Sequence, residues 1–244
     1  MAALQGRTAI ITGGGRGIGL HTAQLLAEQG CSVVLAARGE TEIRAAAEAI
    51  HRTGGRALPV CCDVAVEREV RSLVDATVEQ FGGINIVINN AGGVCRELLV
   101  DTSVEQWDHV LQSQVRGTFL VTRLALPHLL AAGWGRVLTV SSMAGKIGVA
   151  RRVAYCTAKW GQIGFTEALD EELQGTGVRA HVVCPGPVAT RMRAEGYPNE
   201  VPESLIQPET VARQIVSLIT LPETAYIREV CIRTGLPTRY KDTS

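Results

Sequence analysis

The sequence has no excess of either charge, since 24 Lys and Arg residues balance 24 Asp and Glu residues. It also has no block of basic residues, and nucleic-acid binding depends on Lys and Arg that neutralise phosphates. The same balance disfavours an anionic membrane surface as a partner, or a disordered acidic tail. We therefore predict a compact protein that handles a small molecule and has neither a nucleic acid nor a membrane as its partner.

The seven cysteines form no C-x-x-C pair and have no spacing typical of a metal site. Their odd number and scattered positions argue against a disulfide framework, so we expect reduced residues that pack in the core and no bound metal. A run of about 18 apolar residues, long enough to span a membrane, is also absent. The segment from Met1 to Arg7 is too short and too polar for the core of a signal peptide. We therefore expect a cytoplasmic location.

Short β-branched runs alternate with longer helical patterns, which is typical of βαβ units in a parallel sheet. The expected strands are Thr8–Thr12, Val33–Ala37, Ala57–Cys61, Ile84–Asn89, Arg136–Ser141, Arg179–Val183 and Glu229–Ile232. The expected helices lie near residues 17–29, 40–53, 67–81, 103–132, 155–174 and 208–220, the fourth opening on a capping box, Ser103-Val-Glu-Gln106. No linker or repeat divides the chain. We predict one α/β domain over residues 1–244, with a doubly wound, Rossmann-type parallel sheet of about seven strands and helices on both faces.

The first strand leads into a glycine-dense turn and then a helix, with Thr12, Gly13, Gly17 and Gly19 in the pattern T-G-x-x-x-G-x-G. Such a turn lets backbone N–H groups approach a pyrophosphate, while the helix N-terminus supplies a favourable dipole. A glycine-rich loop can also be a plain tight turn. Its place at the first strand-to-helix crossing favours dinucleotide binding.

The end of the second strand indicates which dinucleotide. NAD-binding versions place a carboxylate there for the ribose 2′-hydroxyl, but this chain has Ala37 and Arg38, and no carboxylate until Glu40. A guanidinium suits a 2′-phosphate, and Arg16 in the glycine turn can reach the same group. The alternative is that both arginines are merely solvated. The pattern favours NADP(H).

Tyr155 and Lys159 are four residues apart on an expected helix, and therefore lie on one of its faces. A nearby ammonium lowers the pKa of a phenol and makes proton transfer feasible near neutral pH. Such a pair alone is often incidental. Ser142 follows the fifth strand, at the edge where open α/β sheets bind ligands, and its hydroxyl can hydrogen-bond a carbonyl.

Several motifs occur together and in order: Thr12-x-x-x-x-Gly17-x-Gly19, Asn89-Asn-Ala-Gly92, Ser142, Tyr155-x-x-x-Lys159 and Pro185-Gly186. The ordered set resembles the short-chain dehydrogenase/reductase family, in its NADP-preferring branch, from Gly6 to about Ile232. The resemblance implies cofactor binding by Gly13, Gly15, Arg16, Gly17, Ile18, Gly19, Arg38, Asp63, Val64, Asn90, Ala91, Gly92, Tyr155, Lys159, Pro185, Gly186, Val188 and Thr190.

The resemblance also implies catalytic roles. Tyr155 would protonate a carbonyl oxygen as hydride arrives, Lys159 would bind the nicotinamide ribose, and Ser142 would orient the carbonyl. The family usually has an Asn on the fourth helix that anchors a water linking the lysine to solvent, and this chain has Gln114 there. Gln114 either preserves that relay with altered geometry or only packs inside the helix.

The substrate walls are expected from loops near residues 93–97, 143–153 and 187–207. Arg96, Lys146, Arg151 and Arg152 cluster there in the sequence, either as a rim for an anionic substrate or as solvated charges. The C-terminal segment differs from the glycine-rich end usual in acyl-carrier-protein reductases. It resembles the shorter end of reductases that act on small hydroxy acids, aldehydes and diverse ketones.

The resemblance predicts an NADPH-dependent carbonyl reductase that converts a ketone, aldehyde or 3-oxoacyl-type substrate to an alcohol. One alternative is the same machinery acting as an NADP-dependent alcohol or hydroxy-acid dehydrogenase. The other is a catalytically silent NADP-binding sensor or scaffold, which the intact residues Ser142, Tyr155 and Lys159 disfavour. Helices 103–132 and 155–174 pair across a two-fold interface in the family, which implies a homodimer or homotetramer.

Overall fold

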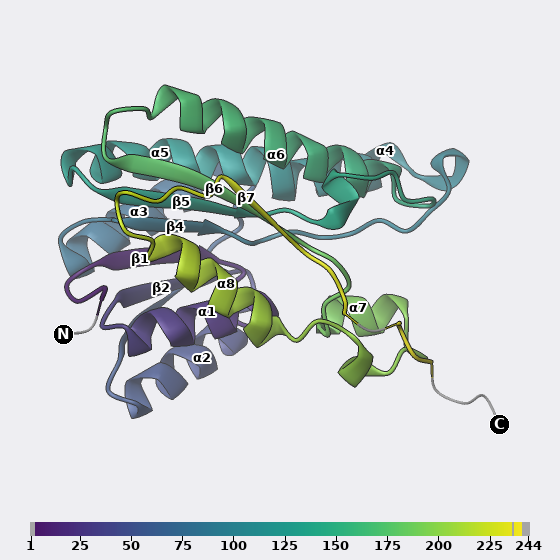
Figure 1. Cartoon of the computed structure of the whole chain (residues 1–244), viewed down its shortest axis with the longest axis horizontal. Helices are drawn as coiled ribbons and strands as arrows, with labels where there is room; N and C mark the ends of the chain where they lie inside the picture. Colours follow the sequence, from purple (N-terminus) through teal and green to yellow (C-terminus); the bar gives the residue numbers. More distant parts are fainter. Residues whose placement is uncertain (1–2, 236, 241–244) are drawn as a thin grey trace.

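A seven-stranded parallel sheet organises the computed structural model, which describes residues 3–235 and 237–240. The strands are β1 (Thr8–Thr12), β2 (Ser32–Ala37), β3 (Arg56–Cys61), β4 (Ile86–Asn89), β5 (Gly135–Val140), β6 (Val178–Pro185) and β7 (Glu229–Ile232). They lie in the order β3-β2-β1-β4-β5-β6-β7. Figure 1 shows the sheet between its two layers of helices. The predicted fold class is confirmed, and the predicted strand ends differ from those observed by two residues or fewer.

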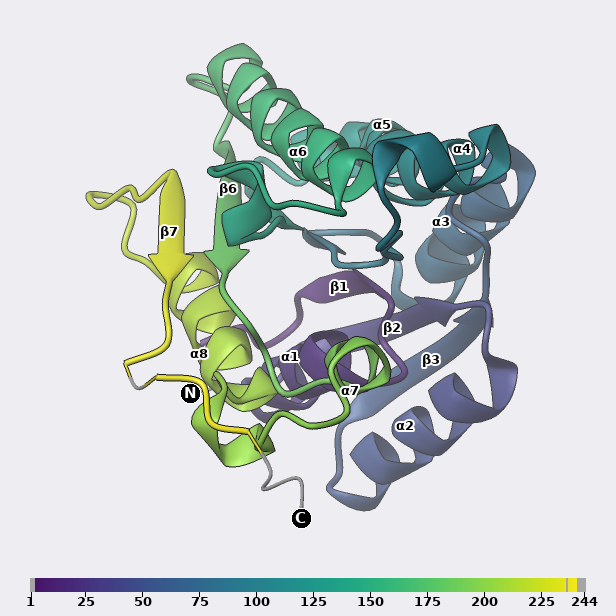
Figure 2. The ribbon, with the colours of Figure 1, turned by 90° about the vertical axis from the view of Figure 1, so that its right-hand side faces the viewer.

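Helices cover both faces of the sheet (Figure 2). They are α1 (Gly17–Glu28), α2 (Glu40–Arg52), α3 (Glu67–Phe81), α4 (Val104–Leu111), α5 (Gly117–Ala131), α6 (Val153–Glu172), α7 (Arg191–Gly196) and α8 (Pro208–Ile219). Helices α1, α2 and α8 pack on one face, and α3 to α6 lie on the other. None of the helices in the described part of the chain is both long and apolar enough to span a membrane.

The central strands are apolar on both sides because each faces two helical layers. Every residue of β1 and β4 is buried, including Ile10 and Ile11, whose side chains point to opposite layers. The chain winds outward from β1 through β2 to β3, then returns to place β4 on the other side of β1. The carboxyl ends of β1 and β4 therefore form the switch point at which open α/β sheets bind ligands.

The helix expected over residues 103–132 is present, but its winding changes in the middle. The capping box is present, with Ser103 Oγ accepting from the Gln106 N–H at 3.2 Å, and α4 starts as predicted. Residues Gln112–Arg116 then form a π turn, which separates α4 from α5. The apolar periodicity of the sequence did not predict the π turn, because the helix is wound more widely only over Gln112–Arg116. The short helix α7 was also not predicted, since its sequence has no apolar stripe.

One threonine hydroxyl connects the two strands at the switch point. Thr12 Oγ1 donates to Ile88 O at 3.2 Å and accepts from the backbone N–H groups of Asn90 and Ala91 at 2.9 and 3.0 Å. Thr12 is buried, and Asn90 and Ala91 are partly buried. The hydroxyl therefore satisfies the backbone where β4 ends and fixes the turn that follows it.

Replacing Thr12 with Val should lower the free energy of unfolding by about 1–3 kcal/mol, because the isosteric side chain leaves two partly buried N–H groups unpaired. Urea unfolding measures this. Thr8→Val is the matched control, because Thr8 is buried at the other end of β1 but its hydroxyl makes no hydrogen bond among the described residues. Equal losses in the two variants would contradict the role of the Thr12 hydroxyl.

Candidate active site

After β1 the chain makes a turn over residues 13–17 that is rich in glycine and therefore has few side chains; we call it the glycine cradle. Gly13 and Gly17 have φ of +64° and +54°, in the left-handed region that favours glycine. A Cβ at Gly19 would collide with Gly13 O, so that helix α1 approaches the turn more closely than another residue would permit. Asn90 Nδ2 donates to Thr12 O at 2.9 Å and ties the turn to the end of β4. The turn therefore leaves room for a diphosphate beside the N-terminus of α1.

The two arginines predicted to bind a 2′-phosphate differ in their surroundings. Arg38 is exposed just after β2, and its guanidinium has no partner in the part of the chain that the structure describes. Arg16 Nη1 instead lies 3.1 Å from Glu42 Oε1, and Glu42 also pairs with Arg191. The sequence indicated Glu40 as the nearest carboxylate and missed this role of Glu42. Only Arg38 is thus an unneutralised cation at this position.

The remaining predicted cofactor residues line the same edge of the sheet. Asp63 Oδ1 accepts from the Ala65 N–H at 3.0 Å in the turn after β3, and Val64 packs in the core. Thr190 begins α7 with its Cγ2 3.4 Å from the position that a Cβ on Gly17 would take. The segment after β6 therefore closes over the glycine turn. Pro185 is the last residue of β6, and Gly15, Ile18, Ala91, Gly92, Gly186 and Val188 lie in the turn, α1 or the segments that follow β4 and β6.

Ser142, Tyr155 and Lys159 come together where β5 ends and α6 begins. Ser142 Oγ accepts from the Ala144 N–H at 3.1 Å, in the short turn that follows β5. Lys159 Nζ lies 5.6 Å from the centroid of the Tyr155 ring. It donates to Val140 O and Gln162 Oε1, both at 2.9 Å. The helical spacing of four residues thus places the phenol and the amine side by side, as predicted.

Burial changes the acidity of both groups. Desolvation raises the pKa of Tyr155, while hydrogen bonding to Ser142 and the charges of Arg152 and Arg96 oppose that rise. Desolvation lowers the pKa of Lys159 to about 7. The site therefore holds a protonated phenol next to an amine that changes its charge close to neutral pH.

Gln114 lies in the π turn and is fully buried. Its Nε2 donates to Gly93 O at 2.5 Å, and its Oε1 has no hydrogen-bond partner among the described residues. The main-chain O of Gln114 accepts from Gln162 Nε2 at 3.2 Å. Gln162 thus joins Lys159 to the π turn, a role the sequence analysis missed. The sequence does contain a signal for this role: Gln162 is a polar residue three positions after Lys159, which places it on the same, buried face of α6.

The comparisons with known proteins agree with this geometry. A family model described as short chain dehydrogenase matches residues 7–200. The chain belongs to the short-chain dehydrogenase family. A 3-oxoacyl-[acyl-carrier-protein] reductase from Synechocystis sp. is 37% identical over 233 residues, which cover 93% of this chain and 94% of that protein.

Two solved structures of the short-chain dehydrogenase type are also similar. A metagenomic short-chain oxidoreductase in complex with NADP has a TM-score of 0.85 and 30% identity, over 96% of this chain and 100% of that one. A variant of the actinorhodin polyketide ketoreductase with NADPH has a TM-score of 0.87 and 31% identity, over 94% of this chain and 97% of that one.

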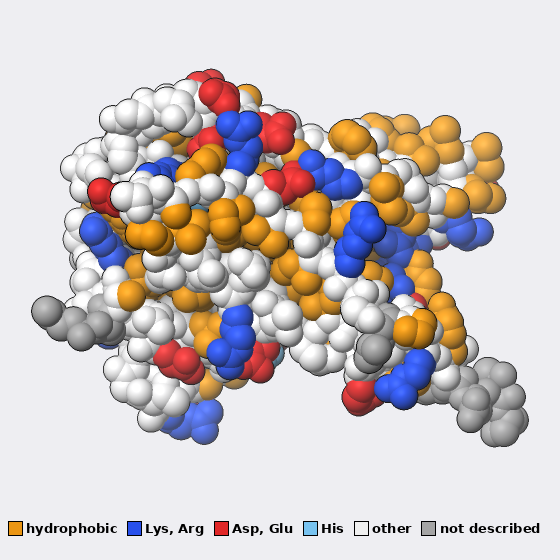
Figure 3. Space-filling model, viewed as in Figure 1, with side chains coloured by type: hydrophobic (Ala, Val, Ile, Leu, Met, Phe, Trp, Pro, Cys, Tyr) orange, Lys and Arg blue, Asp and Glu red, His pale blue; other side chains and the backbone are white. Residues whose placement is uncertain are grey.

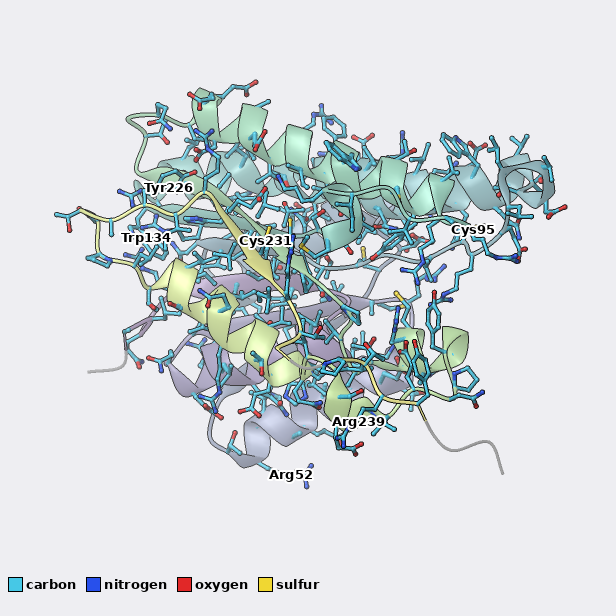
Figure 4. The ribbon with its side chains drawn as sticks, turned by 45° about the vertical axis from the view of Figure 1, so that its right-hand side comes forward. Arg52, Cys95, Trp134, Tyr226, Cys231 and Arg239 are labelled. Atoms are coloured by element: carbon cyan, nitrogen blue, oxygen red, sulfur yellow. The ribbon has the colours of Figure 1, made fainter. Side chains whose placement is uncertain are left out.

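One cluster of sulfur and carboxylate groups lies outside this site, on β6 and β7. Donor atoms of Cys184, Glu229 and Cys231 lie within 4.8 Å of one another, and Figure 4 labels Cys231 on β7. Lys146 Nζ lies 2.5 Å from Glu229 Oε2, so a cation already neutralises the carboxylate. All seven cysteines are free, although Cys61 and Cys231 are exposed rather than packed in the core. The expected absence of a metal stays a prediction.

The buried amine should make stability depend on pH. With the pKa of Lys159 lowered to about 7 from an ordinary value of 10.5, the unfolded chain binds more protons than the folded chain between these values. Stability should therefore rise with pH across this window. Lys159→Met should stabilise the cofactor-free protein by about 2–5 kcal/mol near pH 7, and the gain should fall toward zero near pH 10.5. Urea unfolding at several pH values measures it.

Lys146→Met is the control of opposite sign. The hydrogen bond to Glu229 raises the pKa of Lys146, so its charge stabilises the folded state until the pH rises through that raised value. Its replacement should destabilise the protein at pH 7. A gain from Lys159→Met that is the same at every pH would show that the buried charge is not its cause.

Proposed function

We propose that the chain is an NADPH-dependent carbonyl reductase, which reduces a ketone or aldehyde to an alcohol. The observation that carries the proposal is the convergence of Ser142, Tyr155 and Lys159 at the end of β5, beside a glycine cradle. The NADP and NADPH complexes of the two similar structures support the choice of cofactor. The name of the Synechocystis relative supports a 3-oxoacyl-type substrate as one candidate.

The described residues fit this cofactor. A diphosphate would lie beside Gly17 and Gly19, where the first N–H groups of α1 have no partner within the helix, whereas the Gly13 N–H already donates to Ala36 O at 2.7 Å. Arg38 offers an unpaired guanidinium to a 2′-phosphate, and Arg16 would share its charge between that phosphate and Glu42. When bound, NADPH would supply the hydride that reduces the carbonyl carbon.

The side chains of this protein would supply the proton and the orientation. Tyr155 Oη, kept protonated by its raised pKa, would give its proton to the carbonyl oxygen. Ser142 Oγ would hold that oxygen, and the Lys159 ammonium would stabilise the phenolate that forms. Gln162 and Val140 O fix the position of the Lys159 amine through two hydrogen bonds. A role for Gln114 in returning a proton stays a prediction.

The same residues could also work in the oxidative direction, as an alcohol or hydroxy-acid dehydrogenase, because each proton step is reversible. A silent sensor is disfavoured by the complete set of three catalytic side chains. Loops 93–97, 143–153 and 187–207 would form the substrate walls, and hydrogen bonds connect them: Arg151 to Arg96 O, Arg96 to Met192 O, and Arg152 to Tyr197 Oη. The cytoplasmic location stays a prediction.

The proposal includes a homo-oligomer assembled on helices α4 to α6. An apolar cavity of about 490 Å³ opens on this face. It is lined by Leu111, Gln112, Val115, Arg116, Phe119, Thr157 and Gly161. Phe119 and Trp160 are about half exposed there. Large apolar side chains at such positions favour contact with a second copy of the chain, in a homodimer or homotetramer.

Tyr155→Phe should lower kcat by a factor of about 10² to 10⁴, because it removes the acid while retaining the ring. The dissociation constant of NADPH, measured by its fluorescence, should change only a few-fold. Tyr240→Phe is the matched control, because the Tyr240 side chain is exposed and its hydroxyl makes no hydrogen bond among the described residues. Normal turnover by Tyr155→Phe would exclude Tyr155 as the proton donor.

Arg38→Asp should weaken NADPH binding about tenfold or more, because it places a carboxylate against the 2′-phosphate. NADH lacks that phosphate and should bind with little change. Arg16→Ala should cost less NADPH affinity than Arg38→Asp, since Glu42 already neutralises Arg16. Equal weakening of NADPH and NADH by Arg38→Asp would refute the assigned role.

A further inference from the structure

Two of the arginines at the mouth of the site have no carboxylate partner. Basic side chains gather between the α4/α6 layer and the α7 segment (Figure 3). Three of these cations are neutralised within the chain: Lys146 by Glu229, Arg151 by Glu97 and Arg193 by Glu200. Arg96 and Arg152 make no ion pair within residues 3–235 and 237–240. The four-residue rim expected from the sequence is thus reduced to two uncompensated charges.

Both guanidinium groups are held in place by neutral groups. Arg96 Nη2 donates to Met192 O at 2.6 Å, and its guanidinium packs so closely on Gly196 that a Cβ there would collide with it. Arg152 Nη2 donates to Tyr197 Oη at 2.5 Å. The Cζ atoms of Arg96 and Arg152 lie 5.8 and 5.4 Å from the centroid of the Tyr197 ring. Both guanidinium groups are therefore neighbours of the same ring, on which the guanidinium of Arg193 also packs, at 3.8 Å.

Both guanidinium groups have hydrogen-bond donors for which the described residues provide no acceptor. Arg96 Nε is buried and has no hydrogen-bond partner among the described residues. A guanidinium offers five N–H donors in a planar fork, and each of these two side chains uses one donor on a neutral oxygen. A carboxylate is the planar, anionic acceptor that such a fork binds best.

The start of α6 adds to the positive potential. Arg152 occupies the N-cap position, and the first turn of this helix contains no acidic residue. Helix N-termini favour anions, so that a cation at this position is unfavourable unless an anion joins it. Arg151, directly before it, is the only non-glycine residue with positive φ among the described residues, at +62°. Such local strain is often found where a functional side chain must be aimed.

The arginine pair lies next to the reacting groups. Arg152 precedes Tyr155 by three residues at the start of α6. Residues three apart share a helix face, so an anion held by Arg152 would lie on the side of α6 that carries Tyr155. The positive charges of Arg152 and Arg96 also lower the pKa of Tyr155.

From this arrangement we propose that Arg96 and Arg152 together bind the carboxylate of a short oxo acid, whose carbonyl group lies against Tyr155 and Ser142. The proposal rests on the proposed reductase function and specifies its substrate class. The reaction adds a hydride to the carbonyl carbon and the Tyr155 proton to the oxygen, converts the C=O π bond to C–H and O–H bonds, and oxidises NADPH to NADP⁺. The carboxylate is unchanged and serves only for binding.

The phosphate of a phosphopantetheine arm is also an anion, but it is too far from the thioester carbonyl to contact the arginine pair while that carbonyl contacts Tyr155. That phosphate lies many bonds from the thioester carbonyl, at the outer end of an extended arm. The arginine pair instead lies beside Tyr155, so that a carboxylate on the same small molecule as the carbonyl fits it. A phosphopantetheine-bearing acyl group is therefore an alternative outcome of the test.

The test compares 3-oxobutanoate with its neutral methyl ester, by NADPH oxidation. The wild type should prefer the acid, with a kcat/KM ratio of acid to ester of about ten or more. Arg152→Gln and Arg96→Gln should each lower this ratio about tenfold, mainly through KM for the acid. Arg52→Gln is the matched control, because Arg52 is exposed at the end of α2, outside this site, and makes no ion pair among the described residues (Figure 4). Its ratio should stay at the wild-type value.

The outcomes separate this proposal from the proposed function. Turnover of both compounds without preference for the acid would overturn the carboxylate proposal and leave the reductase function in place. If neither compound is reduced, binding of oxamate to the NADPH complex still decides. Weakening about tenfold by Arg152→Gln but not by Arg52→Gln supports the carboxylate site, and equal binding by these two variants and the wild type overturns it.

A third arm identifies the source of the anion. The 3-oxobutanoyl thioesters of pantetheine and of 4′-phosphopantetheine differ only in the phosphate. A gain in kcat/KM from that phosphate that Arg152→Gln removes would assign the pair to a phosphopantetheine arm and overturn the short oxo acid. No gain from the phosphate, together with a preference for the free acid, supports the proposal.

Discussion

The buried amine of Lys159 has no carboxylate partner among the described residues, and this determines how the proposed catalytic site is built. Lys159 is 6% exposed, and only neutral oxygens on Val140 and Gln162 accept its hydrogen bonds. Because a buried charge needs such partners, the carboxyl end of β5 and the inner face of α6 must stay in register. Gln162 in turn donates to Gln114 O in the π turn. The position of Tyr155 beside this amine therefore depends on α6, β5 and the π turn together.

Around the proposed cofactor site, uncharged groups form the centre and charged side chains lie only at the edge. Thr12 and Asn90 satisfy the backbone where β1 and β4 end, so the glycine turn is fixed before any ligand binds. In the proposed cofactor site, a diphosphate would be held by N–H groups and the dipole of α1 in place of side-chain cations. Selection between the two dinucleotides would then be left to Arg38 and Arg16. Glu42 weakens the second of these, so discrimination would depend mainly on one residue.

Much of this could be predicted from sequence, and the failures have physical causes. Strands such as β4 are continuous apolar runs, which parallel strands between two helical layers require, so the sheet was predictable. The spacing of Tyr155 and Lys159 likewise fixes their shared face. The π turn was not predictable because it changes the winding of a few residues and leaves the apolar pattern intact. Contacts such as Gln162 with Gln114 O join distant segments, and no local pattern reports them.

The net charge of zero does not show how the charged residues are distributed around the site. Lys146, Arg151, Arg193 and Arg16 each have a carboxylate within the chain, which removes most of the long-range field that so many cations would produce. Arg38, Arg96 and Arg152 make no ion pair among the described residues and lie where the proposed ligands would carry anions. Other arginines without an ion pair, such as Arg52 and Arg68, are exposed outside the site, so a missing partner does not by itself identify a binding residue. Arg96 and Arg152 are partly buried, and a partly buried cation without a counter-ion costs free energy that an anion recovers when it binds. The proposed specificity therefore depends on where a partly buried cation is left unpaired, more than on how many cations the chain has.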